Sequence, residues 1–494
     1  MKDIEKNSQD HQLSKFDSNE ITFINNLQNK AKSFYSKIGI ALFEREELAR
    51  LIVLAVLAKE HIFLYGPPGT AKSNIAGALK ELTKGIWYKE LMTDFTKFET
   101  IFGKEVLQSN GLTIRVIKGK LPTAEFAFLD EIFKANPEIL NSLLTILNER
   151  QFDDDYNGTI DVPLSTALAA SNEFPRTSYL KALFERFIFR IPVPNIKDKS
   201  NRRKLFDGEF EKIKDLPLIT KEEIDYVQES YKRVKFSDET ANLLSGIIDV
   251  LYSLVNSEDD HNEKVESVYE VSGRTMVKMG SIMRLSAYMN KRIETDISDL
   301  FLMRYIVWNN MHERNIILPK LNQELFGGEA EFHGDTTKIL ESFSILTNRY
   351  YKSIKPIFFG NTKCSTEKEF NYIKEDIKKF KKEYKESLKA LNEINNKLLK
   401  CKEKENLIRK NIFLFYEKVL DWKVDESLIK VNSDKFNDLV KQIKDYNDIK
   451  IGDKFKFMLL IERTFSLHER ICGELKEWLE INDSYFEYKM ALGI

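Results

Sequence analysis

Gly66-Pro67-Pro68-Gly69-Thr70-Ala71-Lys72-Ser73 joins an apolar run, residues 62–65, to a helical pattern over residues 74–82. A glycine-rich turn between a buried strand and a helix leaves several backbone N–H groups unpaired and pointing one way. These groups lie at the end of the helix where the aligned peptide dipoles favour an anion. The sequence therefore predicts a strand, a phosphate-binding loop and a helix. The alternative is a Pro-Gly turn that joins strand and helix by chance.

Two side chains of this loop suit a nucleotide. The Lys72 ammonium would reach the β- and γ-phosphates, and the Ser73 hydroxyl would ligate the Mg²⁺ that bridges them. Ala71 departs from the usual pattern, which has glycine before the lysine. We expect Ala71 to have a negative φ at the start of the helix, where a Cβ is tolerated. Nucleotide binding through residues 66–73 is then expected to survive.

The composition limits the choice of fold and partner. A chain of 494 residues exceeds what one hydrophobic core organises and predicts roughly two to four domains. Lysine and arginine total 76 against 77 aspartate and glutamate, so the net charge of -1 gives no overall attraction to nucleic acid or to an anionic membrane. The three cysteines form no CxxC pair, and their odd number argues against a disulfide framework. We therefore expect a reducing, cytoplasmic compartment.

The sequence shows no signal peptide and no transmembrane segment. Residues 1–20 are polar and charged and predict a disordered tail. The most apolar stretch, residues 49–58, falls well short of the ~20 residues needed to cross a bilayer and predicts a packed helix. The six histidines lack metal-ligand spacing, so any metal is expected to arrive with the nucleotide.

A second chemical signal is the apolar run over residues 124–129, which ends in Asp130 and Glu131. In a parallel sheet the ligand lies at the carboxyl ends of the strands, so Asp130 would lie beside the phosphate loop and hold Mg²⁺ or its water. Glu131 would then polarise the attacking water. The alternative is a pair of solvated acids at the start of the following helix.

The next elements return the chain to the same edge of the predicted sheet. Residues 137–148 have apolar side chains at helical spacing, and Asn157-Gly158 predicts a hairpin over residues 152–162. Residues 164–170 then predict a buried strand that leads to Asn172, whose amide would bridge water and γ-phosphate. The alternative for Asn172 is a turn-forming asparagine.

These motifs occur in the order found in AAA+ ATPases, and the chain resembles that family over roughly residues 35–320. More narrowly it resembles the MoxR group and, within it, the RavA family. RavA also has alanine before the loop lysine and similar sequence around residues 88–93. The stretches that carry the resemblance are residues 66–73, 128–131, 147–152, 170–173 and 183–190.

The resemblance implies a role for individual side chains of the core. Lys72 and Ser73 would bind phosphate and Mg²⁺. Asp130 and Glu131 would form the Walker B pair, beside Asn172 as sensor 1.

Two arginines complete the site that the resemblance implies. Arg186 is similar to the arginine finger, which enters the neighbouring subunit's site and stabilises the transferring phosphoryl group. Arg190 is the competing finger, and a surface arginine is the other interpretation of Arg186. Arg274 resembles sensor 2, a lid arginine that reaches back to the nucleotide; the alternative is a surface arginine at a helix start. Residues 103–122 are similar in position to the family's helix-2 insertion, whose loops face a central pore and contact the partner.

The expected fold class is α/β. A P-loop core, with a parallel sheet between helices, is followed by an all-α lid and a largely helical C-terminal domain that contains a coiled coil. The lid is expected to be rich in amphipathic stretches such as residues 238–255 and 275–288. The predicted boundaries are a disordered tail over residues 1–20, the core over 21–196, the lid over 197–320 and the helical arm over 321–494.

The arm is predicted from its spacing of apolar residues. From residue 370, apolar positions advance by three and four, as in the seam of a long helix. Acidic residues are interleaved with its lysines and cancel most of the field that would attract nucleic acid. RavA-type chains interrupt this arm with a small β-rich insertion. The sequence predicts no run of strands between about 420 and 460, so partners of that insertion are not carried over.

The resemblance implies a Mg²⁺-dependent ATPase that acts as a homo-oligomeric ring, expected to be a hexamer. It would remodel or activate a protein partner in a chaperone-like way, and a protein with a von Willebrand factor A domain is the partner that the family suggests. A nucleotide-gated scaffold with slow hydrolysis, whose arm recruits partners, is the alternative. A third hypothesis, DNA remodelling, has no zinc ribbon or helix-turn-helix signal behind it.

Overall fold

The computed structural model describes residues 16–326, apart from 110, 176–177, 209–212 and 257–270, and residues 382, 389, 400, 403–404 and 406–414. The chain divides into two compact units. The first comprises residues 1–321 and 404–416, and the second comprises residues 322–403 and 417–494. The core, the lid and the candidate site all belong to the first unit.

A five-stranded parallel sheet forms the centre of the core, in the order β2-β5-β8-β1-β9. The predicted strands are confirmed, because β1 matches its expected range and β5 and β8 shift by one or two residues. The intervening strand β2 follows α3, as a helical crossover requires. The strands are β1 (Ile62–Tyr65), β2 (Trp87–Leu91), β5 (Phe126–Asp130), β8 (Thr166–Ser171) and β9 (Phe189–Pro192).

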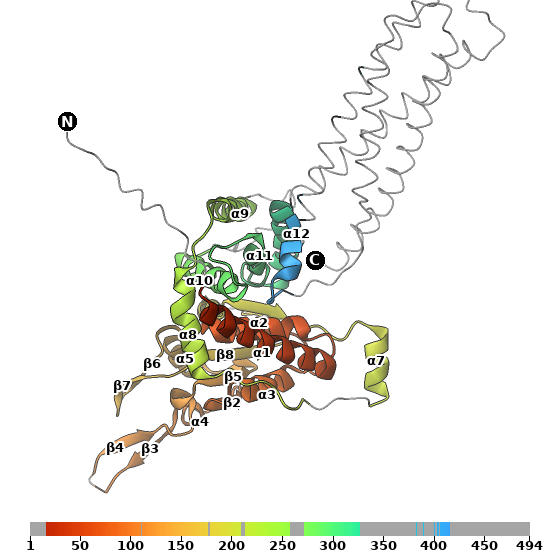
Figure 1. The fold of residues 1–494 in the computed structure, drawn as a ribbon. Coiled ribbons are helices and arrows are strands. Elements are labelled where there is room, and N and C mark those ends of the chain that lie inside the picture. The colour runs from red at the N-terminus through yellow and green to blue at the C-terminus, as the bar shows by residue number, and fades with distance from the viewer. Residues whose placement is uncertain are drawn as a thin grey trace, which may run out of the picture. The chain divides into compact units, whose positions relative to one another are not determined.

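Helices of the core pack around this sheet (Figure 1). In α5 the Asn136 side chain accepts the Ile139 N–H and Pro137 occupies the first turn, so the cap and the fixed φ both favour starting the helix there. The residues expected to be apolar and inward are largely buried in one cluster with β1, β5 and β8. The core helices are α1 (Ser18–Leu42), α2 (Glu46–Ala58), α3 (Lys72–Thr83), α4 (Phe98–Phe102), α5 (Pro137–Glu149) and α6 (Ser178–Phe184).

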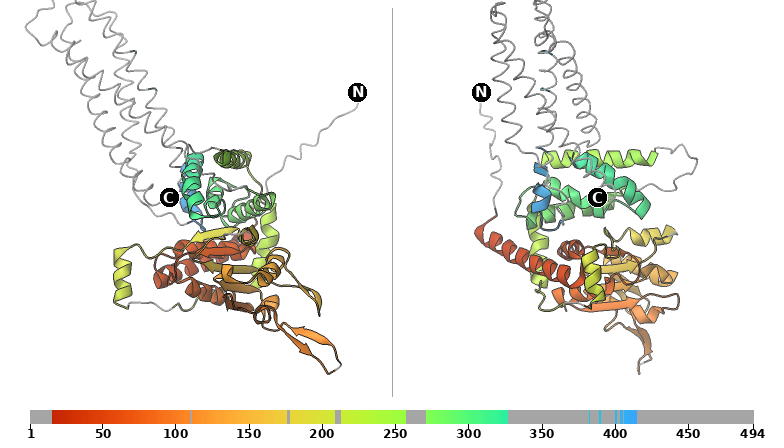
Figure 2. Two further views of the ribbon diagram at one scale, coloured as in Figure 1. Left: turned by 180° about the vertical axis from the view of Figure 1, so that it is seen from behind. Right: turned by 90° about the vertical axis from the view of Figure 1, so that its right-hand side faces the viewer.

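Two β-hairpins leave the core, and Figure 2 shows the longer excursion, β3–β4, extending from it. The first pairs β3 (Lys104–Leu107) with β4 (Thr113–Val116), inside the expected insertion. The second pairs β6 (Gln151–Asp154) with β7 (Gly158–Asp161), as predicted. Apolar side chains are exposed on the first hairpin, among them Leu107 and Leu112.

A buried ion pair joins the two hairpins. Arg115 of β4 donates its Nε hydrogen to Asp154 Oδ1 of β6 at 3.0 Å, and both side chains are buried. Asn157 donates to the Arg115 carbonyl oxygen at 2.9 Å, and the Tyr156 hydroxyl donates to Glu105 at 3.0 Å. Separating the hairpins would therefore break a buried ion pair.

The lid is helical, as expected. Thr220 and Glu223 form a capping box at the start of α8, and Ser272 caps α10. The helix α7, which follows β9, has no buried residue. The lid helices are α8 (Lys221–Ser230), α9 (Asp238–Asn256), α10 (Gly273–Met289), α11 (Ile297–Leu300) and α12 (Met311–Phe326), preceded by α7 (Lys199–Phe206). Short 3₁₀ turns are η1 (Leu121–Thr123), η2 (Ile132–Lys134), η3 (Tyr231–Arg233) and η4 (Phe301–Tyr305).

The predicted bounds of the N-terminal tail and of the C-terminal arm differ from those in the structure. The expected tail over residues 1–20 overlaps α1, which begins at Ser18 with Asp17 as its cap, and Glu20 is buried beside Arg233. At the other end, residues 404–416 belong to the first unit and not to the arm. The predicted coiled coil and the stretch from 420 to 460 lie outside the described residues. None of the helices in the described part of the chain combines the length and apolarity that crossing a membrane requires.

Candidate active site

The phosphate loop lies between β1 and α3 and is anchored to the neighbouring strand. Gly66 donates its backbone N–H to the Ser171 carbonyl oxygen at 3.1 Å. A Cβ on Gly66 would lie 2.3 Å from the Val193 carbonyl oxygen, so only glycine allows this approach of the chain after β9. Gly69 has φ +81°, which also favours glycine. The two glycines thus shape the loop for separate reasons.

The expectation for Ala71 was wrong. Ala71 has φ 67° and ψ 21°, the left-handed conformation, and not the negative φ that we expected. The turn into α3 requires this conformation, and alanine adopts it with about 1–2 kcal/mol of strain that glycine avoids. The loop therefore keeps the glycine-type backbone although the residue has changed.

Lys72 lies at the first position of α3, close to both candidate acids. Its ammonium donates to the carbonyl oxygens of Gly66 and Pro67, at 2.8 Å each. Burial lowers the pKa of Lys72, and the negative charges of Asp130 and Glu131 oppose that shift. The three side chains thus lie within electrostatic reach, as a phosphate and Mg²⁺ site requires.

The two acids follow β5 at the carboxyl end of the sheet. Asp130 is the last residue of β5, and its Oδ1 accepts the Glu131 N–H at 3.2 Å. Glu131 has φ 51°, which turns the chain sharply after the strand. Its Oε2 is buried, lies 3.4 Å from Lys134 Nζ and accepts no hydrogen bond from the residues that the structure describes.

Asn172 lies at the same edge of the sheet. It follows Ser171, the last residue of β8, which is paired with Tyr65 immediately before the phosphate loop. Asn172 is exposed. The structure therefore brings the loop, Asp130, Glu131 and Asn172 together at three adjacent strand ends. The Ser73 hydroxyl and the Asp130 carboxylate are oxygen ligands of the type that Mg²⁺ prefers, so the residues present fit a Mg²⁺–nucleotide complex.

Arg186 and Arg274 lie elsewhere. Phe187, next to Arg186, contacts His61 with ring centroids 6.1 Å apart, at the amino end of β1. Lys278, one turn after Arg274 on α10, pairs with Glu60 at 2.6 Å at that same end. The pKa of Arg186 is lowered by burial and by the positive charge of Arg274, so the two arginines are near each other. The structure does not bring Arg274 to the phosphate loop of its own subunit.

Arg190, the competing finger, is buried in β9 with 1% of its surface exposed. Its Nη1 donates to the carbonyl oxygens of Ile306 at 3.0 Å and Trp308 at 2.6 Å. Its guanidinium also lies over the Phe184 ring, 4.6 Å from the centroid. These contacts join the core to the lid and exclude Arg190 as a group that reaches another subunit in this conformation.

One residue near the loop was missed by the sequence analysis. Arg45, which precedes α2, is buried, and burial lowers its pKa. It donates to the Pro194 carbonyl oxygen at 2.6 Å and, at a long 3.4 Å, to the Thr70 carbonyl oxygen of the loop. An arginine between acids before a helix is typical of a solvated surface, so no sequence signal marks it.

Comparison with known proteins agrees with the resemblance to AAA+ ATPases. Residues 29–229 match the family described as the MoxR domain in the MoxR-vWA-beta-propeller ternary systems, and residues 246–320 match an AAA lid domain. An uncharacterized protein of Methanocaldococcus jannaschii, MJ0812, is 33% identical over 63% of this chain and 78% of its own length.

Two further relatives share the same region. A second uncharacterized protein of M. jannaschii, MJ0079, is 30% identical over 72% of this chain and 91% of its own. The chaperone protein ClpB of Aquifex aeolicus is 27% identical over 48% of this chain and 24% of its own. The finer resemblance to RavA is not tested by these matches and stays a prediction. The domain matches, the relatives and the site together place the chain in the MoxR group of AAA+ ATPases.

Proposed function

We propose that this protein hydrolyses ATP with Mg²⁺ in a homo-oligomeric ring, expected to be a hexamer, and uses the cycle to remodel or activate a protein partner. The observation that carries the proposal is the division of the candidate residues between two places. Lys72, Asp130, Glu131 and Asn172 gather at the phosphate loop, while Arg186 and Arg274 lie at the opposite end of β1. This division supports a role for the two arginines at the site of a neighbouring subunit.

Each side chain at the loop has a separate task in this proposal. Lys72 would leave its two carbonyl acceptors to pair with the β- and γ-phosphates. Glu131 Oε2 would accept the proton of the attacking water, and the Asn172 amide would orient that water. Mg²⁺, held by the Ser73 hydroxyl and by Asp130 in part through water, would neutralise phosphate charge.

Arg186 would stabilise the transferring phosphoryl group of the neighbouring subunit, with Arg274 beside it. Mutual repulsion, which contributes to the lowered pKa of Arg186, would be relieved by the phosphates of a neighbour's nucleotide. Fingers of this kind contribute roughly 10³–10⁵ in turnover. Hydrolysis would then depend on assembly.

The partner is expected to be a protein and not a nucleic acid, since the net charge is -1. The exposed apolar side chains of β3–β4 suit contact with a polypeptide. The matched domain family is described from systems that also contain a vWA protein, which supports a von Willebrand factor A domain protein as the partner. The cytoplasm is the compartment expected from the cysteine usage.

The experiment is a mixing test between two inactive variants. Arg186→Ala subunits keep an intact Glu131, and Glu131→Gln subunits keep an intact Arg186. If Arg186 acts on a neighbour, mixed rings contain complete sites and ATPase activity reappears on mixing. Lys181→Ala, an exposed position on α6, is the matched control and should hydrolyse ATP at the wild-type rate.

Three other results would contradict the proposal. If mixing restored nothing although mixed rings formed, Arg186 would not act in trans. If specific activity were independent of protein concentration while the protein went from dissociated to assembled, obligatory assembly would be wrong. If nucleotide bound and assembled the ring without hydrolysis, the nucleotide-gated scaffold would be favoured.

A further inference from the structure

Residues 406–414, which we name the return segment, complete the lid from a distant part of the sequence. The segment lies in the first unit, whereas the chain on both sides of residues 404–416 belongs to the second. Four of its apolar side chains are buried, namely Ile408, Ile412, Phe413 and Leu414, whereas Leu407 is exposed. The lid family match ends at residue 320, so the segment is an addition to the lid as that family defines it.

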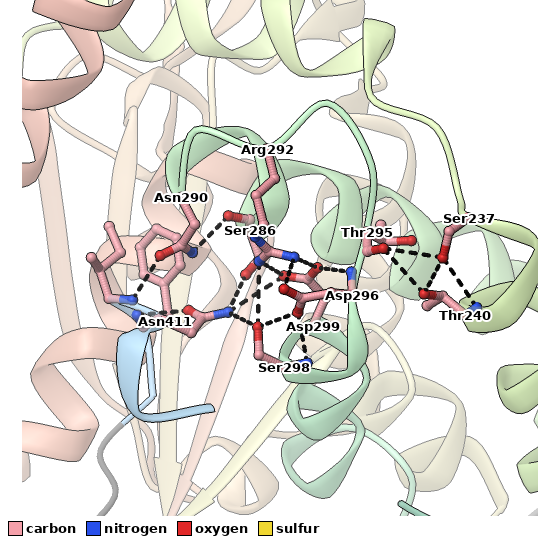
Figure 3. Close-up of polar contacts among 12 residues, drawn as sticks. Ser237, Thr240, Ser286, Asn290, Arg292, Thr295, Asp296, Ser298, Asp299 and Asn411 are labelled. Carbon is pink, nitrogen blue, oxygen red and sulfur yellow. Dashed lines mark hydrogen bonds and ion pairs between the residues drawn. The ribbon is translucent and has the colours of Figure 1, made fainter. Parts of the chain in front are cut away.

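Asn411 is the polar centre of the segment, as Figure 3 shows. It is buried, and its side-chain amide donates to Ser286 at 3.0 Å, Ser298 at 3.1 Å and Asp299 at 3.4 Å. Its Oδ1 accepts the Phe413 N–H at 3.0 Å. Asn411 thus bridges α10 and α11 through side chains that would otherwise be buried without this partner.

Asn290 also binds the segment, and Arg292 fixes one of the side chains that Asn411 contacts. The Ile412 N–H donates to Asn290 Oδ1 at 3.0 Å, and Arg292 holds Asp299 through both carboxylate oxygens at 2.8 and 2.9 Å. Burial raises the pKa of Asp299, and Arg292 opposes that shift. The lid therefore offers a preformed polar site that fits one asparagine and its following main chain.

The segment also reaches the nucleotide core through α2. Arg50 donates from Nη1 to the Ile412 carbonyl oxygen at 2.8 Å. Arg50 lies on α2, and Arg45 at the start of the same helix donates to Thr70 of the phosphate loop. On α2, Glu47 accepts a hydrogen bond from the Tyr305 hydroxyl of the lid. One helix thus contacts the phosphate loop, the lid and the return segment.

We propose that the return segment couples the second unit to the nucleotide site through the Arg50–Ile412 hydrogen bond. When nucleotide orders the phosphate loop, α2 would fix Arg50 and stabilise the docked segment. Because such coupling is reciprocal, pulling on the chain that flanks the segment would weaken nucleotide binding. The proposal rests on the proposed function and deepens it by naming how force on the second unit regulates the ATPase.

The test uses the full chain and the non-hydrolysed nucleotide ATPγS. Hydrogen exchange of a peptide spanning residues 406–414 is measured with and without nucleotide, and ATPγS affinity is measured for each variant. Arg50→Met removes the bond to Ile412, the ion pair with Glu46 and the contact of the guanidinium with the Tyr35 ring, whose centroid lies 4.8 Å away. Glu46→Gln removes only the ion pair and is the matched control. Arg50→Lys keeps the charge without the guanidinium and serves if the methionine variant is misfolded.

The expected result has two parts. ATPγS slows exchange of the segment by at least about fivefold in wild type and in Glu46→Gln, but not in the Arg50 variants. The Arg50 variants also bind ATPγS about fivefold more weakly than Glu46→Gln, the lower limit of typical coupling. The proposal is overturned if nucleotide leaves the segment's exchange unchanged in wild type, or if the Arg50 variants respond as wild type does. Binding of ATPγS by wild type, seen in the same titration, tests the proposed function separately.

Discussion

At the carboxyl end of the central sheet lie an exposed amide and a buried carboxylate oxygen that accepts no hydrogen bond from the described residues, whereas the polar groups around His61 at the amino end are bonded to the surrounding main chain. The carboxyl end has the buried Glu131 Oε2 and the exposed Asn172. At the amino end, His61 Nδ1 accepts the Ala167 N–H at 2.9 Å, so its proton lies on Nε2, which faces the Leu147 carbonyl oxygen at 3.0 Å.

Arg150 completes the amino end. It donates to the carbonyl oxygens of Leu147 at 2.6 Å, Lys59 at 3.1 Å and Ser165 at 3.4 Å. Both this arginine and Ala71 have a positive φ, but Arg150 ends α5, where the left-handed conformation is common. The difference teaches that a positive φ alone does not mark the candidate site, because Arg150 shares this conformation with Ala71 and lies at the other end of the sheet. We expect changes at Glu131 to affect activity and changes at His61 and Arg150 to affect stability.

The largest expected effect is on hydrolysis, from Glu131→Gln. The amide cannot accept the water proton, so turnover should fall by about 10²–10⁴ while ATP binding is retained. Single-turnover hydrolysis and equilibrium binding measure the two quantities. Glu138→Gln, an exposed position on α5, is the control. Wild-type turnover by Glu131→Gln would contradict the assignment of Glu131 as the group that accepts the proton of water.

The next effect is on stability, from Arg150→Met. This change removes a donor from three carbonyl oxygens, of which Leu147 keeps His61 Nε2, and should lower the free energy of unfolding by about 3 kcal/mol. Urea denaturation measures it, with Arg203→Met on α7 as an exposed control. ATP hydrolysis per folded subunit should stay at the wild-type value. A loss of turnover without a loss of stability would show that Arg150 serves the reaction and not the fold.

A smaller effect is a pH dependence of stability due to His61. Burial, followed by the charges of Arg150 and Lys278, lowers the pKa of His61 well below 6.5. Below pH 6.5 the unfolded state therefore binds a proton that the folded state does not. Neutral His61 makes its full contribution to the free energy of unfolding above that pH. As the pH falls toward the folded-state pKa, the free energy of unfolding decreases by up to about 1.4 kcal/mol per pH unit.

Urea denaturation at several pH values between 7.5 and 5 measures this slope. This range brackets the pKa of an unfolded histidine, about 6.5. His61→Gln should reduce the slope, whereas His312→Gln, at an exposed position of α12, controls for the substitution itself. An unchanged slope in His61→Gln would show that other groups dominate acid sensitivity.

The smallest effect is expected at the loop, from Ala71→Gly. Glycine relieves the left-handed strain but has more freedom to lose on folding, so stability should rise by only about 0.5–1 kcal/mol. Ala76→Gly, within the same helix, should instead lower stability by about 1 kcal/mol. Thermal unfolding of the pair measures the contrast. If both changes destabilised equally, Ala71 would not be strained.

Local sequence predicted where the candidate groups at the carboxyl end of the sheet lie, because each of them follows a strand or begins a helix; their roles stay predictions. The loop, Asp130 and Asn172 needed only the positions of β1, β5 and β8. The φ of Ala71 was missed because the preference of alanine for negative φ was given more weight than the geometry of the turn. Here the turn prevailed over the residue's own preference.

Long-range contacts were beyond this kind of inference. Arg190 could compete with Arg186 in the sequence because its acceptors lie 116 and 118 residues away, in the lid. The lid was predicted to end at residue 320, but residues 404–416 belong to the same unit as the lid. No local pattern indicates this, because the sequence around Asn411 resembles any other part of a helical arm. Burial between distant segments is a tertiary property that neither spacing nor composition encodes.

The place of Asn411 in the lid has a consequence for synthesis. Asp299 is made 112 residues before Asn411. At bacterial or eukaryotic elongation rates of about 5–20 residues per second, the ribosome needs roughly 6–22 s to supply the missing partner. During that interval Ser286, Ser298 and Asp299 of the nascent lid lack their contact with Asn411, which has not yet been translated. The lid can therefore finish folding only after much of the second unit has emerged.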